Sequence, residues 1–137
     1  MKILVAVDPS DTVQLPVTRA AAMAKKEGAE LVLLAVAESV EDMESLFGAA
    51  ASERLRDKAA RALGKAQEIV KAAGMTAKEM LEVGVSPESF IVDTAKSGGF
   101  DLIVMGSRVK KGLHTLLIGS VASKVVSLAP CSVLIVR

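Results

Sequence analysis

Two pairs of glycine and serine near the end of the chain are suited to binding phosphate. Gly106-Ser107 and Gly119-Ser120 enclose a segment that contains Arg108, Lys110 and Lys111. Glycine lets a ligand approach the backbone closely, and free N–H groups at the start of a helix bind phosphate oxygens. Basic side chains then balance the charge of the anion. This composition is typical of a phosphate-binding loop.

The elements around this loop predict where it lies. An apolar strand at Asp101–Gly106 precedes it, and a helix from about Leu116 to Leu128 and a strand at Ser132–Val136 follow it. A continuously apolar strand indicates burial on both faces, as in a parallel sheet covered by helices. Open α/β sheets bind ligands at the carboxyl ends of their strands. Gly106 is therefore expected at a ligand-binding edge.

Strands and helices also alternate along the rest of the chain. Strands are predicted at Lys2–Asp8, Glu30–Ala37 and 76–83, and the last is polar enough to be an edge strand. One helix ends near Glu27, a long helix follows an irregular segment at 38–51, and a third begins at Ser86-Pro87 with an N-cap and a proline at N1. The apolar faces of the first two helices contain Val13, Val17, Ala20, Ala21 and Ala24, and Leu55, Ala59, Ala62, Ala66, Ile69 and Ala73. Residues 1–137 are thus predicted to form one α/β domain, with a doubly wound five-stranded parallel sheet and helices on both faces.

Composition excludes several classes of protein. Of the 137 residues, 51% are hydrophobic, with no Trp, no Tyr and three Phe, so the core must be aliphatic and no aromatic platform is available for stacking bases. A net charge of +1 does not indicate nucleic-acid binding. The uncharged runs 112–123 and 125–136 are shorter than the ~18 apolar residues that suggest a membrane span.

The sequence also favours a location in the cytoplasm. Cys131 is the single cysteine, which precludes an intrachain disulfide and fits a reducing compartment. Its apolar surroundings indicate a small core residue rather than a nucleophile. The first residues lack the features of a signal peptide.

Four further patterns carry a resemblance to a known family. They are Asp8 with Ser10 two residues later, Gly84-x-Ser86-Pro87, the run FDLIVMGS at 100–107, and Gly119-Ser120-Val121 leading to APCSVLIV at 129–136. In these motifs the chain resembles the universal stress protein family along essentially its whole length. The resemblance implies a Rossmann-like sheet of order 3-2-1-4-5 and a homodimer formed partly by pairing of the last strands.

The resemblance also implies a nucleotide site. Members that bind ATP carry Gly, two residues, Gly, nine residues, then Gly-Ser or Gly-Thr. Gly106 and Gly119-Ser120 keep this spacing, whereas Val109 replaces the middle glycine. A β-branched residue does not readily adopt positive φ or allow close approach to phosphate, so we expect weakened ATP binding. The implied nucleotide-binding residues are Ala6, Asp8, Val36, Met105, Gly106, Arg108, Val109, Gly119, Ser120, Val121 and Ala122.

Most of these positions also have a purely structural interpretation. Asp8, beside the adenosine by resemblance, can instead cap the turn before the first helix. Ala6 and Val36, which match walls of the adenine site, can be ordinary buried strand residues. Gly106 can serve a tight turn, residues 119–122 can serve helix packing, and Arg108 can be solvated.

The sequence supports two alternative functions. The first is a regulatory module in the stress response that binds ATP, or else AMP or ADP, with Mg²⁺ held by the phosphates. No catalytic or metal-ligating set is visible, so at most very slow ATP hydrolysis is expected. Ser107 and Ser120 lack an acidic residue and a histidine to activate them as nucleophiles. The second is a stress protein without nucleotide, in which the dimer surface or the 38–51 segment contacts unknown protein partners.

Overall fold

The computed structural model describes residues 1–9, 14–107 and 118–137, and its elements alternate as the sequence predicts. Arg108, Val109 and Val13 lie outside these described residues. The elements in chain order are β1 (Lys2–Val7), α1 (Gln14–Glu27), β2 (Glu30–Glu38), α2 (Met43–Phe47), α3 (Ala49–Ala72), β3 (Lys78–Gly84), α4 (Pro87–Ser97), β4 (Leu102–Gly106), α5 (Ser120–Leu128) and β5 (Ser132–Val136).

The five strands form one parallel sheet of order β3-β2-β1-β4-β5, which confirms the expected order. β3 and β5 are its two edges. In the centre of the sheet, Ala6 of β1 lies opposite Leu34 of β2 and Met105 of β4. The carboxyl ends of these three strands therefore meet at one edge of the sheet, which we call the carboxyl edge.

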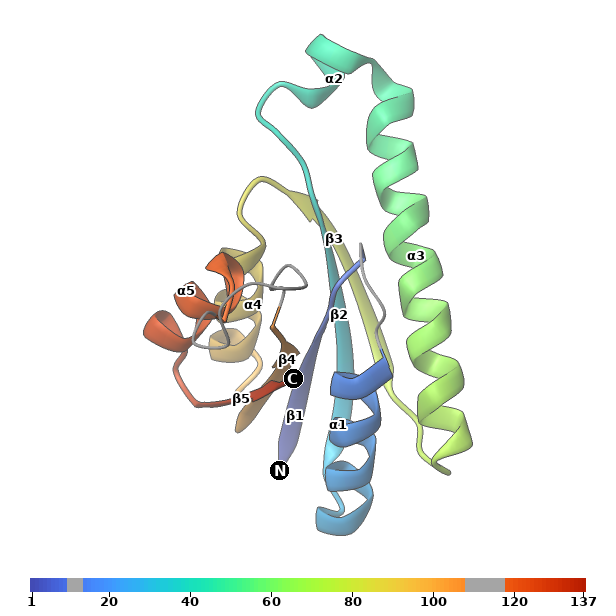
Figure 1. The fold of residues 1–137 in the computed structure, drawn as a ribbon, viewed down its shortest axis with the longest axis vertical. Helices are drawn as coiled ribbons and strands as arrows, with labels where there is room; N and C mark the ends of the chain where they lie inside the picture. Colours follow the sequence, from blue (N-terminus) through green and yellow to red (C-terminus); the bar gives the residue numbers. More distant parts are fainter. Residues whose placement is uncertain (10–13, 108–117) are drawn as a thin grey trace.

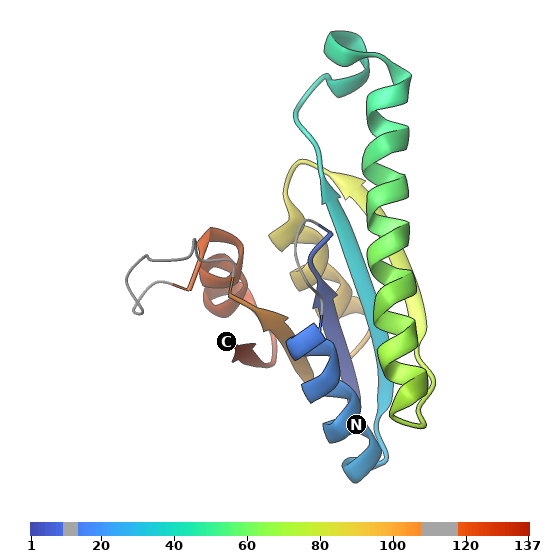
Figure 2. The same cartoon turned by 45° about the vertical axis from the view of Figure 1, so that its right-hand side comes forward.

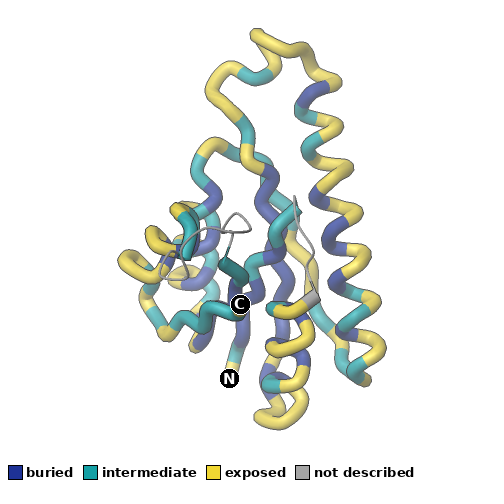
Figure 3. The backbone as a smooth tube through the Cα atoms, in the orientation of Figure 1, coloured by how far each residue is buried: buried dark blue, intermediate teal, exposed yellow. Residues whose placement is uncertain are grey.

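Helices cover both faces of the sheet. α1 and α3 lie on one face, and α4 and α5 lie on the other (Figures 1 and 2). Alternate residues of each central strand point to opposite faces, so the sheet separates two aliphatic clusters. Val5 and Leu33 belong to the cluster beneath α1 and α3, and Leu4 and Leu34 belong to the cluster beneath α4 and α5. Buried residues follow the strands and the inner faces of the helices (Figure 3).

Most helix faces match the predictions. Val17, Ala20, Ala21 and Ala24 are buried on α1. On α3, Ala59, Ala62 and Ala66 are buried, while Leu55, Ile69 and Ala73 pack on the same cluster and remain partly exposed. Among the described helices, none is long and apolar enough to cross a membrane.

Two expectations about element boundaries were wrong. The 38–51 segment is not wholly irregular: it contains α2 and the start of α3 at Ala49. The last helix begins at Ser120 rather than near Leu116, because Gly119 has a φ of 88° that no helix accommodates. The predicted start of α4 is confirmed: Ser86 occupies the N-cap and Pro87 begins the helix, although the Ser86 side chain makes no capping hydrogen bond.

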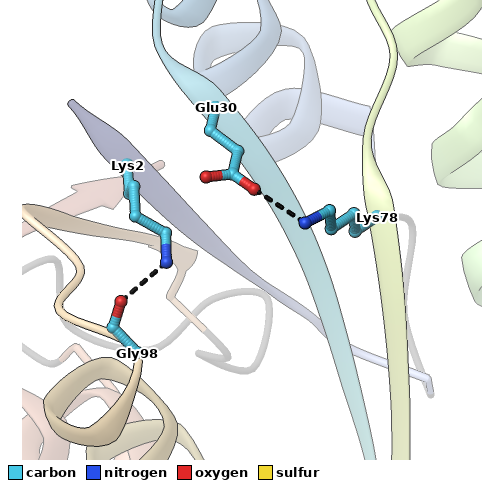
Figure 4. A network of polar contacts seen from close by, with 4 residues as sticks. All are labelled: Lys2, Glu30, Lys78 and Gly98. Carbon is cyan, nitrogen blue, oxygen red and sulfur yellow. Dashed lines mark hydrogen bonds and ion pairs between the residues drawn. The ribbon is translucent and has the colours of Figure 1, made fainter.

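Polar contacts join the strands at the opposite, amino edge of the sheet (Figure 4). The Lys2 ammonium donates to the Gly98 carbonyl at 2.7 Å and lies 4.6 Å from the centroid of the Phe100 ring. Lys78 of β3 lies 3.1 Å from Glu30 of β2 and lowers the pKa of that carboxyl. These residues border a cavity of about 350 Å³. The cation of Lys2 thus stabilises the carbonyl end of α4, where helix dipoles favour positive charge.

Candidate functional site

A pocket of about 310 Å³ lies at the carboxyl edge of the sheet. Strand ends from β1, β2 and β4 form its floor, the first residues of α4 and α5 close one side, and α3 closes the other. This is the edge at which α/β sheets bind ligands. Its described lining residues are Ala6, Val7, Asp8, Pro9, Leu34, Val36, Ala37, Glu38, Leu55, Lys58, Pro87, Ile91, Met105, Gly106, Gly119, Ser120, Val121 and Ala122.

All nine predicted site residues within the described ranges line this one pocket. The strand register explains part of this convergence, because Ala6 and Met105 are paired neighbours on β1 and β4. Residues 119–122, at the start of α5, lie at the same edge. The nine residues are Ala6, Asp8, Val36, Met105, Gly106, Gly119, Ser120, Val121 and Ala122.

An apolar slot occupies the side of the pocket beneath α4 and α5. Val36, Met105 and Ile91 line it, and each is at most 6% exposed. Ala122 of α5 closes the slot with a small side chain. Buried aliphatic walls with few polar groups suit a flat heterocycle, which can be held by dispersion and by backbone hydrogen bonds at its edge.

The first turn of α5 supplies the polar end of the same slot. Gly119 is the N-cap residue with φ 88° and ψ 157°, a backbone region that is essentially restricted to glycine. The Ser123 N–H donates to the Gly119 carbonyl at 3.0 Å and begins the helical pattern. The N–H groups of residues 120–122 therefore precede the first intrahelical bond. Free N–H groups and the helix dipole together favour an anion at this place.

Gly106 lies opposite this helix start, at the end of β4. A Cβ built on Gly106 would stand 3.2 Å from Pro16 Cγ, a tight contact, so close packing against α1 also favours a glycine here. The next residue, Ser107, has a buried hydroxyl oxygen with no hydrogen-bond partner among the described residues. A buried polar atom without a partner costs about 1–3 kcal/mol, which a ligand oxygen or water could offset. Both interpretations of Gly106, packing and ligand approach, thus have support.

The α3 side of the pocket was not predicted from the sequence. Val7 and Ala37 face α3 from the sheet, and Leu55 and Lys58 reach the pocket from α3 itself. Because Lys58 lies three residues after Leu55, both occupy neighbouring positions on one helix face. This spacing was visible in the sequence. Only the packing of α3 against the sheet, however, shows that this part of the helix reaches the carboxyl edge.

The charged side chains among the described lining residues are Asp8, Glu38 and Lys58. Within the described residues, no three His, Cys, Asp or Glu side chains are grouped so that they could hold a metal ion. The described part of the site therefore offers apolar walls, free N–H groups and charged side chains, a set of groups suited to binding a ligand.

Comparisons of this sequence with known proteins all indicate the same family. The sequence model of the Universal stress protein family matches residues 1–137. Universal stress protein YxiE of Bacillus subtilis is 35% identical over 146 residues, which cover 99% of this chain and 98% of that protein.

Solved structures agree with this match. Universal stress protein UspA from Lactobacillus plantarum is 34% identical, with a TM-score of 0.83 over 100% of this chain and 97% of that one. The universal stress protein from Archaeoglobus fulgidus, solved in complex with dAMP, is 25% identical, with a TM-score of 0.73 over 100% of this chain and 98% of that one. The sequence motifs, the sheet order and the full-length matches lead to one conclusion: this chain belongs to the universal stress protein family.

Proposed function

We propose that this protein binds an adenine nucleotide in the pocket at the carboxyl edge and acts as a regulatory module in the stress response. The observation that carries the proposal is the convergence of an apolar slot with the free N–H groups of α5 in one cavity. A relative of the same fold was solved with dAMP, which has the same two parts, a flat base and a phosphate.

The pocket suggests how each part of the nucleotide would be bound. The adenine would lie in the slot between Val36 and Ile91, and the phosphates would lie at Gly106 and the start of α5. Asp8, which follows β1, would accept a hydrogen bond from a ribose hydroxyl or from the adenine amino group. Arg108 and Val109, outside the described residues, belong to the proposed phosphate side on the strength of the sequence motif alone.

We propose ATP as the nucleotide, with AMP and ADP as alternatives, and with Mg²⁺ held by the phosphates. Mg²⁺ commonly binds through substrate phosphates and keeps several waters, so it requires no cage of protein carboxylates. The described pocket residues include no pair of groups suited to activate water against a γ-phosphate. We therefore expect ATP turnover far below ~1 s⁻¹, the low end of ordinary enzyme rates.

Calorimetry tests this proposal directly. Nucleotide-stripped protein is titrated with ATP and Mg²⁺, with AMP, and with GTP as the control for base recognition. We expect a Kd for ATP near 1 μM, about −8 kcal/mol, and weaker binding of GTP. Absence of binding heat, together with absence of co-purified nucleotide, would refute the proposal.

We also propose a homodimer that pairs the β5 strands of two copies. β5 pairs only with β4 among the described strands, and Val133 and Ile135 are partly exposed on it. An unpaired apolar edge strand promotes association. Light scattering after size exclusion should give the mass of a dimer, and Ile135→Lys should shift it towards the monomer. A wild-type monomer at all concentrations would contradict this assembly.

A second candidate function rests on α2. This helix has no buried residue, and Leu46 and Phe47 are 67% and 62% exposed. An apolar pair on a projecting helix suits contact with a partner protein, which is the alternative in which nucleotide plays no part. A Leu46→Ser, Phe47→Ser variant should then lose its partners in a cross-linking assay and keep its fold. Unchanged cross-linking would remove this alternative.

A further inference from the structure

The pocket at the carboxyl edge extends across the sheet from one face to the other. On the α5 side it contains the slot and the helix start described above. On the α3 side it continues into a lobe lined by Val7, Ala37, Leu55 and Lys58, which we call the α3 lobe. Figures 1 and 2 show α3 and α5 on opposite sides of the sheet. A ligand in this pocket is therefore surrounded by groups from both faces.

The charged residues among the described lining residues are two acids and one base. Asp8 and Glu38 carry carboxylates at the ends of neighbouring strands. Charges within one cavity of this size lie inside or near the Debye length of about 8 Å at physiological salt, so they interact with a bound phosphate. Among the described lining residues, Lys58 is the one cation, and so the one side chain whose charge attracts a phosphate.

The ammonium of Lys58 is available for this role. Lys58 is exposed, and it makes no ion pair or hydrogen bond with any residue of the described ranges. Its neighbours at i−4 and i+3 on α3 are Arg54 and Arg61, which are also exposed and without an ion pair among the described residues. Residues at these spacings share a helix face, so the three cations place positive potential beside the α3 lobe.

We propose that Lys58 determines specificity in this pocket, by binding the anionic part of the ligand from the α3 lobe and so selecting adenosine phosphates over neutral adenosine. This inference rests on the proposed adenine-nucleotide function. It adds a contact from the face of the sheet opposite to α5, and it assigns the selection of a charged ligand to a side chain rather than only to backbone N–H groups.

Lys65 provides a matched control for testing Lys58. It lies seven residues later on the same face of α3, is exposed, has no ion pair among the described residues, and does not line the pocket. The experiment compares wild type, Lys58→Gln and Lys65→Gln by calorimetry with AMP and with adenosine, at low and at high salt. Thermal melting of each variant verifies that the fold is unchanged.

We expect Lys58→Gln to weaken AMP binding by about fivefold or more, as loss of a charge-assisted contact does, while adenosine binding changes by less than about twofold. The dependence of AMP affinity on salt should also become smaller in Lys58→Gln. Lys65→Gln should match wild type with both ligands. Lys58→Arg, which keeps the charge, should restore most of the AMP affinity.

Three results would overturn the inference. If Lys58→Gln weakens AMP no more than Lys65→Gln does, Lys58 does not contact the anion. If it weakens adenosine and AMP equally, Lys58 supports the pocket rather than selecting the phosphate. If wild type binds neither AMP nor adenosine nor ATP, the proposed nucleotide function fails, and the inference fails with it; this case is distinguished from the first two because wild type itself shows no binding.

Discussion

Gly106 at the end of β4 and Pro16 in α1 approach so closely that a Cβ on Gly106 would lie 3.2 Å from Pro16 Cγ. Gly106→Ala should therefore reduce the free energy of unfolding by about 1 kcal/mol, because overpacked sites must displace their neighbours. It should also weaken AMP binding, since displacement of Gly106 changes the pocket wall. Urea denaturation and calorimetry measure the two effects. Unchanged AMP affinity despite lower stability would mean that Gly106 serves packing alone.

Gly64 serves as the stability control for Gly106. It lies within α3, and a Cβ built on it would meet no atom within 4 Å. Alanine is the better helix former by about 1 kcal/mol, so Gly64→Ala should raise the free energy of unfolding by up to that amount and leave AMP binding unchanged.

Gly119→Ala should damage the anion-binding start of α5. The φ of 88° and ψ of 157° at Gly119 cost a residue with a Cβ about 1–3 kcal/mol, which the chain can relieve by unwinding the first helical turn. Either response misplaces the N–H groups of residues 120–122, and AMP affinity should fall by about tenfold, equivalent to about 1.4 kcal/mol.

Gly99, a second glycine with positive φ, provides a control that distinguishes loss of stability through backbone strain from loss of AMP binding. Gly99 has a φ of 64°, and a Cβ built on it would meet no atom within 4 Å; it lies after α4, near the amino edge of the sheet. Gly99→Ala should cost about 1–2 kcal/mol of stability without affecting AMP. If the two variants lose AMP affinity equally, the effect of Gly119→Ala reflects global stability rather than the helix start.

Val109→Gly should tighten ATP binding. The substitution restores the glycine spacing of family members that bind ATP, and it removes a β-branched side chain from the proposed phosphate side. Parallel titrations of wild type and variant with ATP and Mg²⁺ measure the change. Equal affinities would show that Val109 does not limit phosphate binding.

Glu38→Gln should change AMP affinity in the opposite direction to Lys58→Gln. Removal of a carboxylate from the pocket lining reduces repulsion of the phosphate, so AMP affinity should increase by about two- to threefold while adenosine affinity remains the same. Glu53→Gln removes an exposed carboxylate of α3 that does not line the pocket, and it should have no effect. An equal response of both variants would indicate a general effect of net charge.

Cys131 should react slowly with thiol reagents in the folded protein. Burial raises the pKa of its thiol, and the nearby Asp101 carboxylate raises it further. The thiolate is the reactive form, so its fraction at pH 8 should be lower than for a free cysteine. Alkylation rates in the presence and absence of denaturant measure this. A folded rate equal to the denatured rate would contradict the shift.

Much of this architecture is readable from local patterns. The strands at 102–106 and 132–136 are predicted by their continuous apolar runs, and α3 is predicted by the spacing of Ala59, Ala62 and Ala66. Side chains that share one face of a helix recur every three to four residues, so this spacing indicates a helix with one buried face. Boundaries were harder to predict. The start of α5 depends on the backbone conformation of Gly119, and α2 depends on Asp42, whose φ of 57° is unusual for a residue with a side chain.

For the pocket, the glycine and serine residues and the resemblance to the universal stress protein family together indicated Ala6, Asp8, Val36, Met105, Gly106 and residues 119–122, and all of these line the cavity. These indications were not sufficient to identify Leu55 and Lys58. A lysine on an amphipathic helix is most often a solvated residue, and no local pattern distinguishes Lys58 from Lys65. The difference between them arises only when α3 packs across the sheet and brings one of its turns to the carboxyl edge, a placement determined by long-range contacts rather than by the residues of the helix itself.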